Sequence, residues 1–386
     1  MYQKRMPFAE KEFRERLSNV QETMKEKGLD LLLVHTPENI FYLTGHHSAG
    51  YFMYMCLVVH ATEDPVLVLR YGEIGNALIY SFLDEQQICS YDDTEDPVEK
   101  TIQAIRRFPL GKGKIGIEAR SLFFSIERYK QLAGALSGIE LVDTWGIVEK
   151  FRMIKSPAEL AYIRQACQAV DAGMEAAVNA IGKGVNEDCA AAALWEAIVS
   201  HGCQHLGMEP FVAKGWKSGL MHNVWSGEPI QEGDCILLEV PAAINRYHGL
   251  LMRTVYVGDP PPIIREWSAV CIEALNGAIN AIRPGVTSGE VDEACRGVIE
   301  RAGLYDHFRK RTGYAVGCAF APDWGEGHIA SLQKDDPLVL REGMVFHMPP
   351  AIRMRGEFGV GFSETVFVTK DGCEVVTHYP RELVVR

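Results

Sequence analysis

Two segments of the chain, residues 174–186 and 275–287, repeat one another without a gap. Six residues recur at a constant offset of 101 positions, and Gly184 of the first copy returns as Gly285 of the second. Both copies predict a helix, a turn that contains glycine, and a second helix. Two amphipathic helices with glycine caps can look alike by chance, but an ungapped repeat at a constant offset favours a duplication. A duplicated domain would leave a pocket between its two halves, where ligand sites are common.

The part of the chain before the repeat has a different pattern. Short apolar runs such as Leu31–Val34 and Val66–Arg70 predict strands, and the spacing of segments such as Val98–Arg107 predicts helices between them. The run Asn39–Thr44 is interpreted as one more strand. This alternation indicates an α/β layer arrangement with a mixed sheet.

A change of domain is predicted where a capping box opens a long helix. Ser156 and Glu159 supply the two capping side chains, and Pro157 stands at the first helical position. We therefore divide the chain into an N-terminal α/β domain over residues 1–150 and a duplicated domain over residues 151–386, which carries the chemistry.

The composition excludes several kinds of partner. The chain has 39 lysines and arginines against 51 aspartates and glutamates, a net charge of −12, so we expect neither nucleic acid nor an anionic membrane as a partner. The longest apolar run, Tyr51–Val59, is far shorter than the roughly 20 residues of a membrane helix. The N-terminal segment has no apolar signal-peptide core, and the ten cysteines are scattered, so we expect reduced thiols in a cytoplasmic protein.

Two residues are the candidates for catalysis. His222 lies in a glycine-rich loop, where a histidine can be merely solvated or can move protons. Glu239 ends the strongly apolar strand Cys235–Leu238, and a buried carboxylate is costly without a partner or a ligand. The structural alternative for Glu239 is an ion pair with Arg253 or Arg246.

Other polar and aromatic side chains in the second domain are candidates for substrate binding, and several have a structural alternative. His248 could pack in a hairpin and Trp324 in the core, although an aromatic ring beside carboxylates also suits a cationic ligand. Asp323 and Glu326 could form a loop-and-cap pair. The candidates are Arg246, His248, Arg253, Tyr314, Asp323, Trp324, Glu326, His347 and Glu364.

The order and spacing of these segments resemble the pita-bread, or M24, superfamily, which includes creatinase, prolidase, aminopeptidase P and methionine aminopeptidase. The resemblance covers nearly the whole chain and includes the linker Arg152–Ser156. It implies an α/β (α+β) fold, in which a creatinase-like N-terminal α/β domain precedes a pita-bread domain of two duplicated αβ halves. The repeat found from the residues alone agrees with this arrangement.

The resemblance also locates the positions at which the metallopeptidases of the superfamily bind two divalent ions through two Asp, one His and two Glu. In this chain these positions hold Glu239, Leu250, Tyr314, Pro349 and Ser363. Hard divalent ions need several oxygen ligands, and one carboxylate does not supply them, even if Glu364 is recruited. We therefore expect no metal cofactor, and the alternative is Mn or Co bound through unexpected ligands.

Within the superfamily the chain resembles the metal-independent branch of creatinase and ectoine hydrolase. His222 matches the creatinase proton shuttle, but the two glutamates that bind creatine fall on Met252 and Pro349, which counts against creatine as substrate. The run Glu239–Thr254 and the segment 313–326 look more like ectoine hydrolase.

We therefore predict a metal-independent hydrolase of a C–N bond in a small zwitterionic or cationic compound, with an ectoine-like cyclic amidine or amide as the leading substrate. Glu239 would bind the cation or act as a base, and His222 would pass the proton. Arg253 or Arg246 would hold a carboxylate. The first alternative is a metal-dependent Xaa-Pro dipeptidase or aminopeptidase P, and the second is a non-catalytic pita-bread binding module.

The resemblance further implies a homodimer, in which the N-terminal domain of one chain reaches the site of its partner. The residues expected to matter for this are His46, His47, Tyr51 and Phe52.

Overall fold

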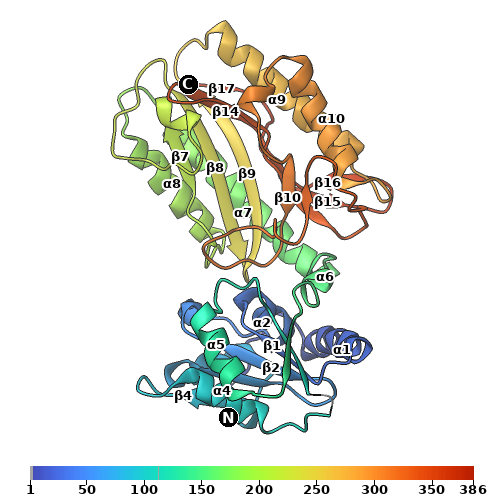
Figure 1. Cartoon of the computed structure of the whole chain (residues 1–386). Coiled ribbons are helices and arrows are strands. Elements are labelled where there is room, and N and C mark those ends of the chain that lie inside the picture. The colour runs from blue at the N-terminus through green and yellow to red at the C-terminus, as the bar shows by residue number, and fades with distance from the viewer. Residues whose placement is uncertain (1–2, 112) are drawn as a thin grey trace. The chain divides into compact units, whose positions relative to one another are not determined.

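The computed structural model describes residues 3–111 and 113–386, and the chain divides into two compact units, Met1–Arg152 and Met153–Arg386. The first unit is a six-stranded mixed sheet with helices around it (Figure 1), as the alternation predicted. The strand order is β4-β3-β2-β1-β5-β6, with β2 antiparallel to both neighbours and the other pairs parallel. Its elements are α1 (Glu10–Lys27), β1 (Leu31–Val34), α2 (Pro37–Thr44), β2 (Cys56–His60), β3 (Val66–Arg70), α3 (Ile74–Tyr80), β4 (Ile88–Tyr91), α4 (Pro97–Ile105), β5 (Lys114–Ile117), α5 (Ile126–Ala135), β6 (Glu140–Asp143) and α6 (Glu149–Arg152).

The strand predicted over Asn39–Thr44 is wrong, because Pro37–Thr44 forms helix α2 with a proline in its first turn. Glu118, which follows β5, accepts hydrogen bonds from the backbone N–H groups of His35 and Thr36 at 2.8 and 2.7 Å. A side chain distant in sequence therefore supports the start of this helix. The helix is buried on nearly all sides, which removes the polar face that identifies a helix in a sequence.

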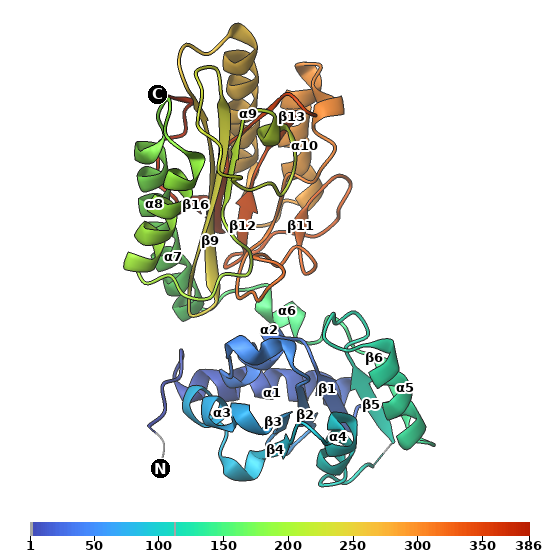
Figure 2. The ribbon, with the colours of Figure 1, turned by 90° about the vertical axis from the view of Figure 1, so that its left-hand side faces the viewer.

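The second unit consists of two halves with the same plan, as the repeat predicted. In the first half, α7 (Pro157–Ala180) and α8 (Glu187–Ser200) form a helix pair, and α7 packs against the sheet β17-β9-β8-β7. In the second half, α9 (Pro262–Ala281) and α10 (Ser288–Arg301) pack against the sheet β11-β10-β12-β15-β16 and the hairpin β13–β14. Figure 2 shows the two helix pairs on opposite sides of the strands of this unit. The predicted capping box of Ser156 and Glu159 does open α7.

The strands of the second unit are β7 (Phe211–Lys214), β8 (Cys235–Ile244), β9 (Tyr247–Tyr256), β10 (Gly313–Ala315), β11 (Ser331–Leu332), β12 (Val345–Met348), β13 (Ala351–Met354), β14 (Phe358–Gly361), β15 (Glu364–Val368), β16 (Cys373–Val375) and β17 (Val384–Val385). In the described part of the chain, no helix is long and apolar enough to cross a membrane.

Equivalent glycines of the repeat make equivalent hydrogen bonds. The backbone N–H of Gly184 donates to the carbonyl of Ile230 at 2.8 Å, and that of Gly285 donates to the carbonyl of Leu340 at 3.0 Å. Both glycines have a positive φ, 84° and 91°, a conformation that a residue with a Cβ rarely adopts. The repeat thus fixes the same helix–turn–helix geometry twice, and each half fills its own apolar core.

Candidate active site

Glu239 is a buried carboxylate on β8, where its backbone pairs with Phe211 of β7 and Met252 of β9. Only 7% of the residue is exposed. Burial raises the pKa of its carboxyl group above the ordinary value, while the positive charges of Lys310 and Arg353 oppose this rise. The carboxylate therefore faces two side-chain cations in a poorly hydrated place.

Neither of these cations is among the site residues predicted from the sequence. Lys310 precedes β10, and although the residue as a whole is half-buried, desolvation and the charge of Arg353 lower the pKa of its ammonium from 10.5 to about 7. Burial also lowers the pKa of the Arg353 guanidinium on β13. The Nε atom of Arg353 has no hydrogen-bond partner among the described residues. Lys310 stands between two exposed arginines, so its sequence context gave it the pattern of a solvated charge run.

Beside Glu239 a chain of hydrogen bonds links side chains of β10, β12 and the loops next to them. Trp324 Nε1 donates to Tyr314 Oη at 2.8 Å, and Tyr314 Oη lies 2.9 Å from His347 Nδ1. His347 Nε2 lies 2.7 Å from Ser363 Oγ. Burial and the charge of Lys310 lower the pKa of His347, and burial raises the pKa of Tyr314. We refer to these four residues as the neutral relay, because neither titratable member carries a charge near pH 7.

His222 lies at the exposed edge of this region, in a loop where its backbone has a φ of 54°. Its ring centroid is 5.8 Å from that of Phe211, and the Phe211 ring is 5.0 Å from that of Trp324. Phe211 thus connects His222 to the neutral relay and, through the backbone, to Glu239. The described contacts bring the two predicted catalytic residues to the same region without a direct contact between their side chains.

Arg253 and Glu364 lie together in the interior and are engaged with one another. Arg253 Nη2 donates to Glu364 at 2.7 Å, and further donors of the guanidinium reach the carbonyl oxygens of Ser363, Tyr379 and Pro380 at 2.7, 2.6 and 2.6 Å. Both side chains are fully buried. This arrangement favours a structural role for the pair over substrate binding, and the alternative ion pair between Arg253 and Glu239 is not formed.

Two further candidates occupy a loop before β11. The carboxylate of Glu326 accepts a hydrogen bond from Lys155 Nζ at 2.6 Å, and both side chains are only 1% exposed. Asp323 is exposed and accepts a hydrogen bond from the backbone N–H of Gly325 at 3.0 Å. Asp323 thus supports a turn of the loop, whereas Glu326 forms a buried ion pair with a lysine that the sequence did not indicate, in place of the predicted pairing with Asp323.

His248 and Arg246 support the turn between β8 and β9. The guanidinium of Arg246 stacks 4.1 Å from the ring centroid of Phe320. His248 Nδ1 lies 2.8 Å from the carbonyl oxygen of Arg246, and its Nε2 accepts a hydrogen bond from the N–H of Gly207 at 2.9 Å. Both ring nitrogens are used, so His248 is a buried neutral histidine, and burial lowers its pKa to about 4.

The pKa of His248 predicts a loss of stability in mild acid. The folded protein keeps the imidazole neutral down to about pH 4, whereas the unfolded chain binds a proton near pH 6.5, so stability falls as the pH falls between these values. We expect this residue to contribute about 2 kcal/mol of the loss in unfolding free energy between pH 7 and pH 5. Urea denaturation of the wild type and His248→Gln at both pH values measures it. An equal pH dependence in the two proteins would contradict the assignment.

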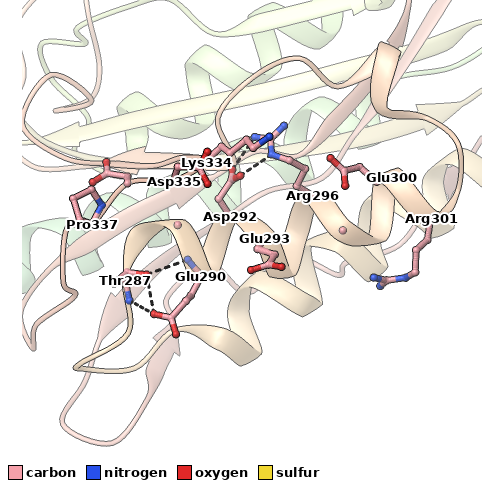
Figure 3. Close-up of a pocket in the computed structure, with 13 residues that line it drawn as sticks. Thr287, Glu290, Asp292, Glu293, Arg296, Glu300, Arg301, Lys334, Asp335 and Pro337 are labelled. Atoms are coloured by element: carbon pink, nitrogen blue, oxygen red, sulfur yellow. Dashed lines mark hydrogen bonds and ion pairs between the residues drawn. The ribbon is translucent and has the colours of Figure 1, made fainter.

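An open hollow of about 700 Å³ lies elsewhere on this unit, along α10 and the loop 334–337 (Figure 3). None of the predicted site residues lines it. Asp292 and Arg296, two of the charged residues that line it, already pair with one another through two hydrogen bonds of 2.6 and 2.9 Å. Thr287 and Glu290 similarly form the capping box of α10. The hollow is therefore a polar surface groove separate from the candidate site.

The residues at the ligand positions of the metallopeptidases do not fit a pair of divalent ions. Leu250 has no donor atom, and Tyr314 and Ser363 use their hydroxyl groups in the neutral relay. The remaining carboxylate, Glu239, already faces two cations. Among the described residues, no group of three or more His, Cys, Asp or Glu side chains could hold a metal ion.

The two αβ halves, with candidate residues on the strands between their helix pairs, define a pita-bread domain that follows a separate α/β domain. The chain belongs to metallopeptidase family M24, whose model matches residues 161–370, and the creatinase/prolidase N-terminal domain matches residues 16–154. It is a hydrolase of this family by that relationship.

Similar proteins of the family differ in what they act on. The chain is 27% identical to the ectoine hydrolase of Halomonas elongata, with 100% of both chains covered. It is also 27% identical to the Xaa-Pro dipeptidase of Pyrococcus furiosus, with 96% of this chain and 100% of the other covered. The structure of the dipeptidase PepE from Mycobacterium ulcerans superposes with a TM-score of 0.82 at 25% identity, covering 98% and 99% of the two chains.

Proposed function

We propose that the chain hydrolyses a C–N bond in a small compound that carries a delocalised cation and a carboxylate, and that no divalent metal takes part. An ectoine-like cyclic amidine is the leading substrate. The observation that carries the proposal is the environment of Glu239, a buried carboxylate with a raised pKa that faces two protein cations where a metallopeptidase has a metal ligand. The full-length similarity to an ectoine hydrolase supports the same substrate class.

In the proposed reaction, the positive charge of the amidinium makes its carbon electrophilic enough for a positioned water molecule to attack. Glu239 accepts one proton of the water as the oxygen bonds to that carbon, and its raised pKa makes it a stronger base. The C–N bond of the resulting tetrahedral intermediate then breaks as its hydroxyl group loses the remaining proton to solvent water, and His222 at the edge of the site delivers a proton to the leaving nitrogen. Because the substrate is cyclic, the ring opens and the product is one molecule that carries an amide and an amine.

A hydrolysis assay with and without metal tests this proposal. The protein is treated with a chelator and dialysed, and the ring opening of ectoine is followed by proton NMR in buffer alone and with Mn or Co. We expect the same rate in all three conditions. If the stripped protein is inert and added Mn or Co restores the reaction, the metal-independent mechanism is wrong.

An Xaa-Pro dipeptidase that uses divalent ions is the second candidate, and the similarity to the dipeptidase of Pyrococcus furiosus supports it. Release of proline from an Xaa-Pro dipeptide, measured beside the ectoine assay, separates the two. This candidate requires about two ions per chain in elemental analysis of the gently purified protein. A non-catalytic binding module would turn over neither substrate and would keep its biological activity in His222→Ala.

A further inference from the structure

Lys310 and Arg353 are half-buried cations whose interactions with the protein are incomplete. Neither side chain forms a direct ion pair among the described residues, and both interact with Glu239 only through the longer-range attraction of charges. Arg353 Nε is buried without an acceptor. A buried N–H group of a guanidinium that lacks an acceptor is costly, so this donor points to an oxygen atom that the chain itself does not supply.

The charges around these two cations do not balance. The described groups that influence the charge of Lys310 are Arg353 on β13, Glu239 on β8, Cys271 on α9 and Cys295 on α10. Lys310 in turn influences the charge of His347 on β12. Burial raises the pKa of both thiols to about 12, so they are neutral, and His347 is neutral as well. Two cations therefore face a single carboxylate, and the surplus positive charge is one reason why Lys310 holds its proton weakly. An anionic group would remove the surplus.

We propose that Lys310 and Arg353 bind the carboxylate of the substrate and so select free acids over their neutral analogues. The planar guanidinium suits the two oxygens of a carboxylate, and the ammonium adds a second charge to the same group. Glu239 is then left to face the cationic part of the substrate. These residues take the place that the sequence analysis gave to Arg253 or Arg246, whose contacts lie inside the fold. That the substrate is an amidine rests on the proposed function. That Lys310 and Arg353 need an anionic partner does not rest on it.

Matched pairs of ligands test the subsite by isothermal titration calorimetry. One pair is ectoine and its carboxamide, and the other is an Xaa-Pro dipeptide and its amide, so that one pair probes each candidate function. We expect the wild type to bind the acid of a pair about 10- to 100-fold more tightly than the amide. Lys310→Met and Arg353→Met should lose most of this preference, and Arg353→Lys should keep part of it. The exposed neighbours provide the controls Arg309→Met and Arg355→Met, which should retain the full preference.

Kinetics on whichever substrate is turned over give a second readout. The loss of a binding group should raise KM more than it lowers kcat, which a variant that merely misfolds would not do. An acid preference restricted to the dipeptide pair, and lost in both methionine variants, would support the subsite and contradict the amidine substrate. An acid preference that survives in both variants, or no preference for either acid, would overturn the subsite even if hydrolysis of ectoine is observed.

Discussion

Replacing Arg253 with methionine is expected to lower the free energy of unfolding by about 3 kcal/mol, the lower part of the range for breaking a buried ion pair. The guanidinium is fully buried and donates to Glu364 and to backbone carbonyls of two later segments of the chain. Methionine has a similar length but no donors, so these acceptors would be left without their partners. Arg381 Nε donates to Glu364 at 2.9 Å and would still pair with this carboxylate in the variant. The loss of unfolding free energy should therefore stay below the upper end of the range.

Urea denaturation followed by circular dichroism measures this loss, with Arg265→Met as the control. Arg265 pairs with Asp259 at the surface, where the two side chains are 55% and 93% exposed, so its loss should change the stability by no more than about 0.5 kcal/mol. The double variant Arg253→Met with Glu364→Gln should be more stable than Arg253→Met alone, because it no longer buries a carboxylate that only Arg381 compensates. If Arg253→Met is as stable as the control but loses substrate affinity, Arg253 is a binding residue after all.

The parts of the fold that the sequence predicted are those specified by local signals. The glycines of the repeat and the capping box at Ser156 act on their immediate neighbours, so their pattern indicates a helix boundary without any knowledge of the tertiary structure. Helix α2 depends instead on Glu118, which lies more than eighty positions after His35, and no local pattern predicts that contact. Its apolar run was therefore interpreted as a strand.

In the candidate site, too, local patterns predicted only the residues whose role does not depend on partners distant in sequence. Glu239 was visible because a carboxylate interrupts an apolar strand, and this interruption is a local signal. Arg253 looked equally suited to a ligand, but Glu364, which lies 111 positions further on, already occupies it. Lys310 looked like a surface charge because two exposed arginines flank it, and no local feature marked Arg353 as part of a site. Whether a cation is satisfied inside the protein depends on partners distant in sequence, and the sequence does not show them.

Replacing Glu239 with glutamine is expected to lower kcat by about 10²- to 10⁴-fold, the usual contribution of a positioned general base. Glutamine keeps the shape of the side chain but cannot accept the proton of the attacking water. Glutamine also removes the one carboxylate that faces Lys310 and Arg353, so the melting temperature should fall, although burial opposes the charged form of this carboxyl group. Turnover is therefore measured well below the melting temperature of the variant, where the folded protein should still lack it.

Two companion variants sharpen the test of Glu239. Glu239→Asp keeps the charge but withdraws the carboxylate by one methylene group, and a displacement of about 1 Å is expected to cost about 10²-fold in rate. Glu357→Gln removes an exposed glutamate between β13 and β14 and should leave both turnover and stability unchanged. All three proteins are compared by NMR with the substrate that the wild type hydrolyses. Turnover in Glu239→Gln within tenfold of the wild type would exclude Glu239 as the base and leave it the task of binding the substrate cation.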